Sequence, residues 1–106
     1  MSSHGCLTDN QVLDGVRVLV RQNKIRWTDH SEQRMEERGY DRGQIRQCLL
    51  SGVFVQRPVI PNRTGPLQYE VKMRAKVDGV WIEVVASLVP VTKVVVITVI
   101  DPENRS

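Results

Sequence analysis

The chain has 106 residues, of which 41% are hydrophobic, and it carries a formal net charge of +3. This length suits one domain with a modest core, and 15 basic residues set against 12 acidic ones exclude the dense basic surface of a dedicated duplex-binding protein. The two cysteines and two histidines lack the spacing of a disulfide framework or a zinc site, so no metal or cofactor is expected.

The two ends of the chain carry little pattern. Residues 1–7 are predicted to be disordered, residues 8–101 to form a single α+β domain, and residues 102–106 to be a polar tail. The start lacks the basic and then apolar pattern of a signal peptide, and no apolar run reaches the length of a membrane span. We therefore expect a soluble, cytoplasmic protein with no membrane partner.

The domain begins with helical periodicity. Thr8 and Gln11 have the spacing of a capping box, which satisfies free backbone N–H groups at a helix start. The apolar residues that follow recur on one helical face: Val12, Val16, Leu19 and Val20. The pattern predicts an amphipathic helix over about residues 9–23.

A polar helix is predicted next, over residues 29–38. Asp29 has the N-cap position with Glu32 three residues later, and Gly39 is the residue that favours the left-handed conformation after a helix end. Only Met35 is apolar between these ends, so the helix is expected to bury little.

The polar side of this helix contains a stripe of candidate site residues. His30, Arg34 and Arg38 are spaced i, i+4 and i+8, which places them on one face with Glu37 beside them. Histidine is the side chain that changes charge near neutral pH, and arginine holds anions through a fixed fork of donors. This pattern predicts a group that can bind a phosphate and move a proton.

A charged helix face is more often simply solvated, and that alternative stays open. The helix would then have surface Glu–Arg pairs, and His30 would pack on Trp27. Arg34 would in that case tie the helix to the strands through Glu70 or Glu83.

A third helix is predicted from Asp41, whose capping partner is Gln44, to about residue 51, just before Gly52. Residues 53–60 read as an extended segment, and Pro58 indicates a sheet edge. Residues 61–66 are predicted to be a loop by composition.

The second half of the chain has strand periodicity. Residues 67–77 alternate between apolar and polar, with Tyr69 on the apolar face and Lys72 and Arg74 on the polar one. Asp78-Gly79 predicts a type I′ hairpin turn, which sets Arg74 opposite Glu83. The run 93–100 is almost all β-branched, which predicts an interior strand covered on both faces.

These elements predict an α+β fold. Two to three N-terminal helices would pack on one face of a three- to four-stranded antiparallel sheet. The other face of the sheet would carry the polar side chains of residues 67–76.

The segment His30-x-x-x-Arg34-Met35-x-x-Arg38-Gly39, followed by Asp41, resembles the family named domain of unknown function 4258. The resemblance runs from about residue 25 to 101 and includes the strands and the Asp-Gly turn. That family is similar to the RelE-like and BrnT-like toxins of bacterial toxin–antitoxin pairs. The resemblance implies their helix-then-sheet fold and, as an expectation, cleavage of RNA without a metal.

The function that this resemblance favours is a toxin-type endoribonuclease. His30 would act as general acid or base, Arg34 and Arg38 would hold the phosphate, and Glu37 would be a second acid–base partner. Further RNA phosphate contacts would come from the sheet, from Lys72, Arg74 and Tyr69, although the alternation places Tyr69 on the apolar side. A cognate antitoxin or immunity protein would be the protein partner.

Two other functions stay open. The chain could be a non-catalytic interaction module that docks such an antitoxin or immunity protein. Nonspecific nucleic-acid binding is the weaker option, because the sequence shows no interleaved exposed aromatic residues on which bases would stack.

Overall fold

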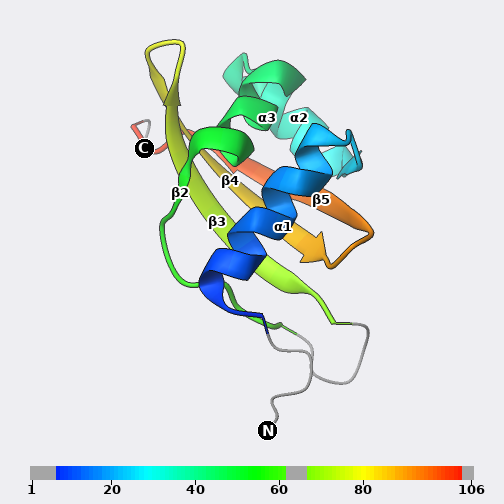
Figure 1. Cartoon of the computed structure of the whole chain (residues 1–106). Coiled ribbons are helices and arrows are strands. Elements are labelled where there is room, and N and C mark those ends of the chain that lie inside the picture. Colours follow the sequence, from blue (N-terminus) through cyan, green and yellow to red (C-terminus); the bar gives the residue numbers. More distant parts are fainter. Residues whose placement is uncertain (1–6, 62–66, 104–106) are drawn as a thin grey trace, which may run out of the picture.

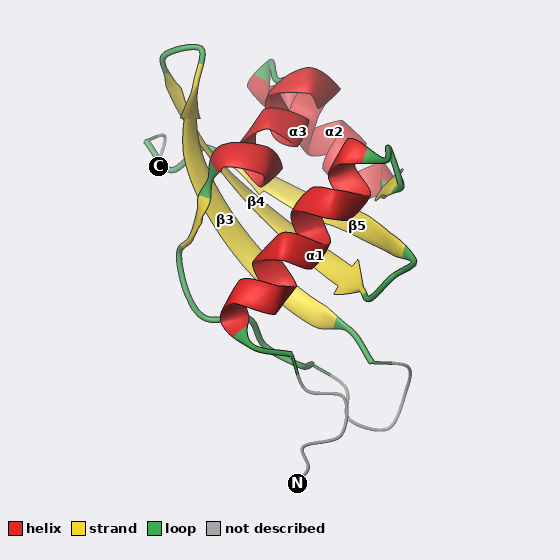
Figure 2. Ribbon diagram, viewed as in Figure 1, coloured by secondary structure: helices red, strands yellow, loops and turns green. Residues whose placement is uncertain are grey.

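The structure is a computed structural model that describes residues 7–61 and 67–103. The described elements are α1 (Asp9–Arg21), β1 (Ile25–Trp27), α2 (Asp29–Arg38), α3 (Arg42–Ser51), β2 (Val53–Phe54), β3 (Tyr69–Val77), β4 (Val80–Val89) and β5 (Lys93–Ile100). The strands form one sheet in the order β1-β5-β4-β3-β2 (Figures 1 and 2). The predicted α+β class, with helices packed on a sheet, is confirmed.

Helices α1 and α3 lie across the sheet (Figure 1), because their apolar stripes match its apolar face. Helix α3 packs on β3 and β4, and α1 packs on β4 and β5. The predicted capping boxes are present at both helix starts, Thr8 with Gln11 and Asp41 with Gln44. The residues predicted to line the buried side of α1 are buried: Val12, Val16, Leu19 and Val20.

The N-cap of α2 lies one residue earlier than predicted. Thr28, not Asp29, is the N-cap, because its Oγ1 accepts from the Ser31 N–H at 3.0 Å. The same hydroxyl lies 3.0 Å from the Val96 carbonyl oxygen and 3.1 Å from that of Ile97, so it can donate to β5. The cap therefore fixes the start of α2 against the middle of β5. The predicted end is confirmed, with Gly39 at φ 77°.

The β3–β4 hairpin has the predicted register. Asp78 and Gly79 both have positive φ, of 52° and 81°, as a type I′ turn requires. Arg74 lies opposite Glu83, as the turn predicted. One face of β3 is therefore buried beneath the helices, and the other remains uncovered.

The sheet is not purely antiparallel, which corrects the prediction of three or four antiparallel strands. Residues 25–27, for which no strand was predicted, form β1 and pair in parallel with β5, Ile25 beside Val94 and Trp27 beside Val96. Three residues are too few for a period to identify a strand, and the pairing depends on β5, which lies almost seventy positions later. At the opposite edge, the expected extended segment 53–60 forms the two-residue β2 and one bridge, from Val59 to Glu70.

Strand β5 is interior, between β1 and β4, as its composition predicted. The expectation that both its faces are covered is wrong. Val94, Val96 and Val99 are buried on the helix side, whereas Val95 and Thr98 are only half-buried on the other side. In the described residues, the helices shield one face of the sheet, so the β-branched residues of the other face reflect strand propensity.

The ends of the domain are described only in part. Residues 1–6, 62–66 and 104–106, which include most of the predicted disordered start, the loop and the tail, lie outside the described residues. Leu7 is described, and its backbone N–H donates to the Tyr69 hydroxyl at 2.8 Å.

Cys48 lies in the core under β3 and β4. Burial, the largest cause, raises the pKa of its thiol to about 12, with a smaller contribution from the Glu83 carboxylate.

We expect this thiol to make stability fall at alkaline pH. A thiol in the unfolded chain ionises near pH 8.5, so the contribution of Cys48 is fully present below that pH and is lost as the pH rises toward 12. In urea unfolding under reducing conditions, the wild type should lose up to about 1.4 kcal/mol per pH unit above pH 9 relative to Cys48→Ala. If the free energies of unfolding of the two proteins changed in parallel with pH, the buried, protonated thiol would be contradicted.

Candidate functional site

The predicted stripe on α2 is present on the side of the helix away from the core, with His30 exposed and Arg34 and Arg38 half-buried. His30 is exposed in the first turn, and Arg34 and Arg38 follow at one and two further turns. The opposite side of the helix is anchored by Ser31 and Met35, which are buried. His30 makes no hydrogen bond or ion pair within the described residues, so its imidazole is accessible to a ligand.

Glu37 contacts Arg34 and Gln33. The Arg34 guanidinium donates to the Glu37 carboxylate at 3.2 Å, and the Gln33 side-chain amide donates to the same carboxylate at 3.3 Å. These contacts hold Arg34 against the helix. Seven residues, about 10 Å along the helix axis, separate Glu37 from His30.

Arg38 belongs to a charged cluster where α2 ends. Its Nε atom is buried and has no hydrogen-bond partner within the described residues. Burial, the largest cause, and the nearby Asp101 carboxylate raise the pKa of Tyr40, whereas the Arg38 charge lowers it. The Tyr40 hydroxyl donates to the Trp81 carbonyl oxygen at 3.4 Å, which joins the end of α2 to the start of β4.

Lys72 and Arg74 lie together on the uncovered sheet face and share one carboxylate. The Arg74 Nε donates to Glu83 Oε1 at 3.0 Å, and the Lys72 Nζ lies 3.7 Å from Glu83 Oε2. Glu83 is only 5% exposed, because these two side chains cover it. The single Glu83 carboxylate therefore neutralises half of the positive charge of Lys72 and Arg74.

We expect Glu83→Ala to destabilise the fold by about 1–3 kcal/mol, because two neighbouring cations lose their shared partner. The estimate stays below that for a fully buried pair, since Lys72 and Arg74 can reach solvent. Urea unfolding would measure the loss, with Glu70→Ala as the matched control on the same face of the sheet. Equal stability of the two variants would contradict this role of Glu83.

Tyr69 lies apart from Lys72 and Arg74. It faces the helices, is 3% exposed and accepts the hydrogen bond from Leu7. The alternation along β3 therefore places it in the core.

The alternative interpretation of α2 is confirmed in part, because surface Glu–Arg pairs are present, Arg34 with Glu37 and Arg42 with Glu32. The expected tie from Arg34 to the strands is wrong. Arg34 pairs with Glu37, and Glu83 pairs within the sheet. A different arginine joins the helices: Arg42 contacts Glu32 and lies over the Trp27 ring, 5.1 Å from its centroid.

The sequence analysis missed Trp81. It is 38% exposed, and its position directly opposite Lys76 places it on the basic face of the hairpin. The register set by Asp78-Gly79 was the signal that could have identified it. Among the described residues, Trp81 is a single exposed aromatic residue, so it adds one stacking surface and not the interleaved set that single-strand binders use.

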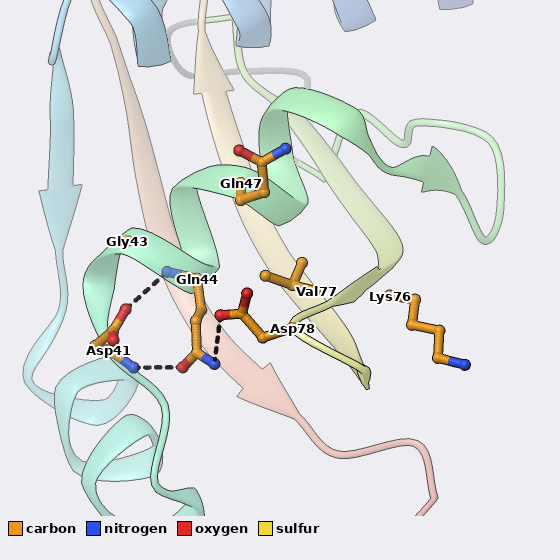
Figure 3. Close-up of a pocket in the computed structure, with 7 residues that line it drawn as sticks. All are labelled: Asp41, Gly43, Gln44, Gln47, Lys76, Val77 and Asp78. Atoms are coloured by element: carbon orange, nitrogen blue, oxygen red, sulfur yellow. Dashed lines mark hydrogen bonds between the residues drawn. The ribbon is translucent and has the colours of Figure 1, made fainter.

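A polar hollow of about 580 Å³ lies between the start of α3 and the β3–β4 turn (Figure 3). Its polar groups mostly serve the fold. Asp41 and Gln44 cap the helix, and the Gln44 amide also donates to Asp78 at 3.4 Å, which ties the hairpin turn to α3. Neither the α2 stripe nor the Lys72–Glu83–Arg74 cluster borders this hollow.

The stripe and the basic strand residues occupy different surfaces. Lys72 and Arg74 point away from the helix-covered face, whereas His30 lies beside β1, at the start of α2. The contact between Tyr40 and Trp81 is where the two surfaces approach each other.

Two further properties bear on possible ligands. Among residues 7–61 and 67–103, no three His, Cys, Asp or Glu side chains form a group that could hold a metal ion. No helix in the described ranges is long and apolar enough to cross a membrane.

A family model described as a domain of unknown function (DUF4258) matches residues 27–101, which is more than half of the chain. The match covers α2, α3 and the whole sheet except most of β1. Neither a curated protein nor a solved structure matches the chain.

Proposed function

This chain belongs to the DUF4258 family, and we propose that it is a toxin-type endoribonuclease that cuts RNA without a metal ion. The stripe on α2 carries the proposal. Histidine and two arginines occupy successive turns of a helix that contributes only two side chains to the buried region. The residue types are those that phosphate-ester chemistry uses.

The chemistry is an attack of the ribose 2′-hydroxyl on the adjacent phosphate. The 2′-oxygen bonds to phosphorus, the bond to the 5′-oxygen breaks, and the products are a 2′,3′-cyclic phosphate and a 5′-hydroxyl. One proton must leave the nucleophile and one must reach the leaving oxygen. His30 performs one of these transfers, since its imidazole is exposed and histidine is the side chain most often used for proton transfer in enzymes.

The arginines stabilise the negative charge that develops at phosphorus. Arg34 lies one turn from His30 and faces the same phosphate, and Arg38, about 12 Å from His30 along the axis, binds a neighbouring phosphate. Glu37 acts through its ion pair, which positions Arg34. His30 also lies at the helix start, where the backbone dipole favours an anion.

The sheet supplies a second surface for RNA. Lys72 and Arg74 would attract the backbone, with their charge reduced by Glu83. Tyr69 has no part in the proposal, because it is in the core.

Induced expression in bacterial cells tests the proposal. The wild type is compared with His30→Ala and Arg34→Ala, with growth followed and cellular RNA 5′ ends mapped, so that a ribosome-dependent activity remains visible. The matched control is Glu36→Ala, an exposed position on the same helix whose side chain makes no hydrogen bond or ion pair within the described residues. We expect growth arrest and new RNA ends in the wild type and the control, and loss of both in the two site variants at equal soluble levels. Normal growth and unchanged RNA in all four strains would overturn the proposal.

A non-catalytic module that docks an antitoxin or immunity protein is the second candidate. The uncovered sheet face, with half-exposed Trp81 and 66% exposed Val53, favours it. Under this function, His30→Ala changes nothing, whereas charge reversal at Arg34 or Arg74 abolishes capture of the partner.

A further inference from the structure

A second hollow, of about 240 Å³, lies on the uncovered side of the sheet near the end of the domain. Arg74, Trp81, Pro102 and Glu103 line it. It brings the first residues of β4 together with the turn that follows β5. The combination of an indole, a proline ring, a guanidinium and a carboxylate is one that a flat, polar-edged ligand fits.

The walls of this hollow are held in place by the fold. The Trp81 backbone accepts from Tyr40, and Arg74 is fixed by its bond to Glu83. The Glu103 N–H donates to the Asp101 carboxylate at 3.0 Å, which forms the turn that presents Glu103. A ligand would therefore meet groups that are already positioned.

The charges around the hollow favour a nucleic-acid strand. Lys76 lies directly opposite Trp81, and Arg74 lies two positions along the same strand. Lys76 makes no ion pair within the described residues. An exposed aromatic residue between two cations is the arrangement on which unpaired bases stack while the cations attract the phosphates.

We propose that this hollow binds one unpaired guanine base of the RNA. The base stacks on the Trp81 indole, and the Glu103 carboxylate accepts from its N1–H and N2–H groups. Guanine alone among the four bases presents two adjacent donors on its Watson–Crick edge, and a carboxylate has two acceptor oxygens to match them. Within the described residues Glu103 forms no ion pair, so its oxygens are available for this contact.

The hollow lies near the end of the α2 stripe, because the hydroxyl of Tyr40, two residues after Arg38, donates to the Trp81 carbonyl oxygen at 3.4 Å. A strand whose base is held at Trp81 can therefore extend toward Arg38 and then His30. In taking RNA as the ligand, this inference rests on the proposed function. The inference adds recognition of one base, guanine, by which the protein would select its RNA substrate.

Nucleotide titration tests the site without any cleavage step. In the Trp27→Phe variant, shown first to match the wild type in circular dichroism and melting, Trp81 is the sole tryptophan. GMP, AMP, CMP and UMP are titrated while its fluorescence is followed. We expect saturable quenching by GMP at concentrations about tenfold lower than for the other three. Glu103→Gln in the same background should remove that preference, and Glu70→Gln, away from the hollow, should keep it.

Each outcome decides the proposal. Equal quenching by all four nucleotides, or a GMP preference that survives Glu103→Gln, overturns the assignment of guanine. The absence of quenching overturns the site. Selective GMP binding by a protein that cleaves no RNA in cells would contradict only the proposed function. Cleavage in cells without nucleotide binding would contradict only this inference.

Discussion

Gly52→Ala is expected to destabilise the domain by about 3 kcal/mol, because an added Cβ has no space. At this position it would lie 2.5 Å from the Cys48 carbonyl oxygen and 2.7 Å from the Arg74 carbonyl oxygen. Both atoms belong to the backbone of packed elements, so neither can move aside alone. The Gly52 carbonyl oxygen also accepts from the Arg17 guanidinium at 3.0 Å, which ties the same point to α1.

Urea unfolding of the two proteins measures this loss as a lower midpoint at an unchanged slope. Gly39→Ala is the matched control. Gly39 has a φ of 77° and open space around it, so its substitution should cost about 1 kcal/mol through backbone strain alone. A loss at Gly52 no larger than the loss at Gly39 would contradict the close approach of α3 to β3.

These two glycines show which features of the fold could be predicted from the sequence. Gly39 was identified as a left-handed helix end because that signal is local. Gly52 was identified only as the residue after a helix, and its actual φ of −78° needs no glycine. Part of its requirement arises from the Arg74 carbonyl of β3, more than twenty residues away, and no local pattern records that approach.

The same distinction explains the strands. The β3–β4 register was predictable because a two-residue turn fixes every pair in the hairpin, including Lys76 opposite Trp81. Strand β1 was not predictable, because its three residues pair with a strand formed much later in the chain. The N-cap of α2 was misplaced for a related reason, since Thr28 gains from β5 the carbonyl contacts that favour it as the cap.

The candidate site residues also divide into those that local spacing predicts and those that depend on the complete fold. Helical spacing alone placed His30, Arg34 and Arg38 on one face. The pairing of Glu37 with Arg34 also follows from local spacing. The hollow at Trp81 needed Glu103 to come from beyond β5, and that proximity depends on the complete sheet.

In purified protein, we expect His30→Ala to lower kcat for RNA cleavage by about 10²–10⁴-fold, the contribution usual for one proton-transfer group. The substrate would be a single-stranded RNA that spans a cut mapped in cells. Because His30 is exposed and its side chain makes no hydrogen bond or ion pair within the described part of the chain, the melting temperature should not change. A loss of activity can then be assigned to chemistry.

Arg38→Ala separates binding from chemistry on the same helix. It should raise KM by about tenfold and change kcat little, because Arg38 would hold a phosphate next to the one that reacts. Glu36→Ala, at an exposed position on the same helix, should match the wild type in both parameters. If His30→Ala instead raised KM with kcat unchanged, the histidine would be a binding residue, and the proton transfer would belong to another group. The α2 stripe would then be an RNA-binding surface that carries no part of the cleavage step.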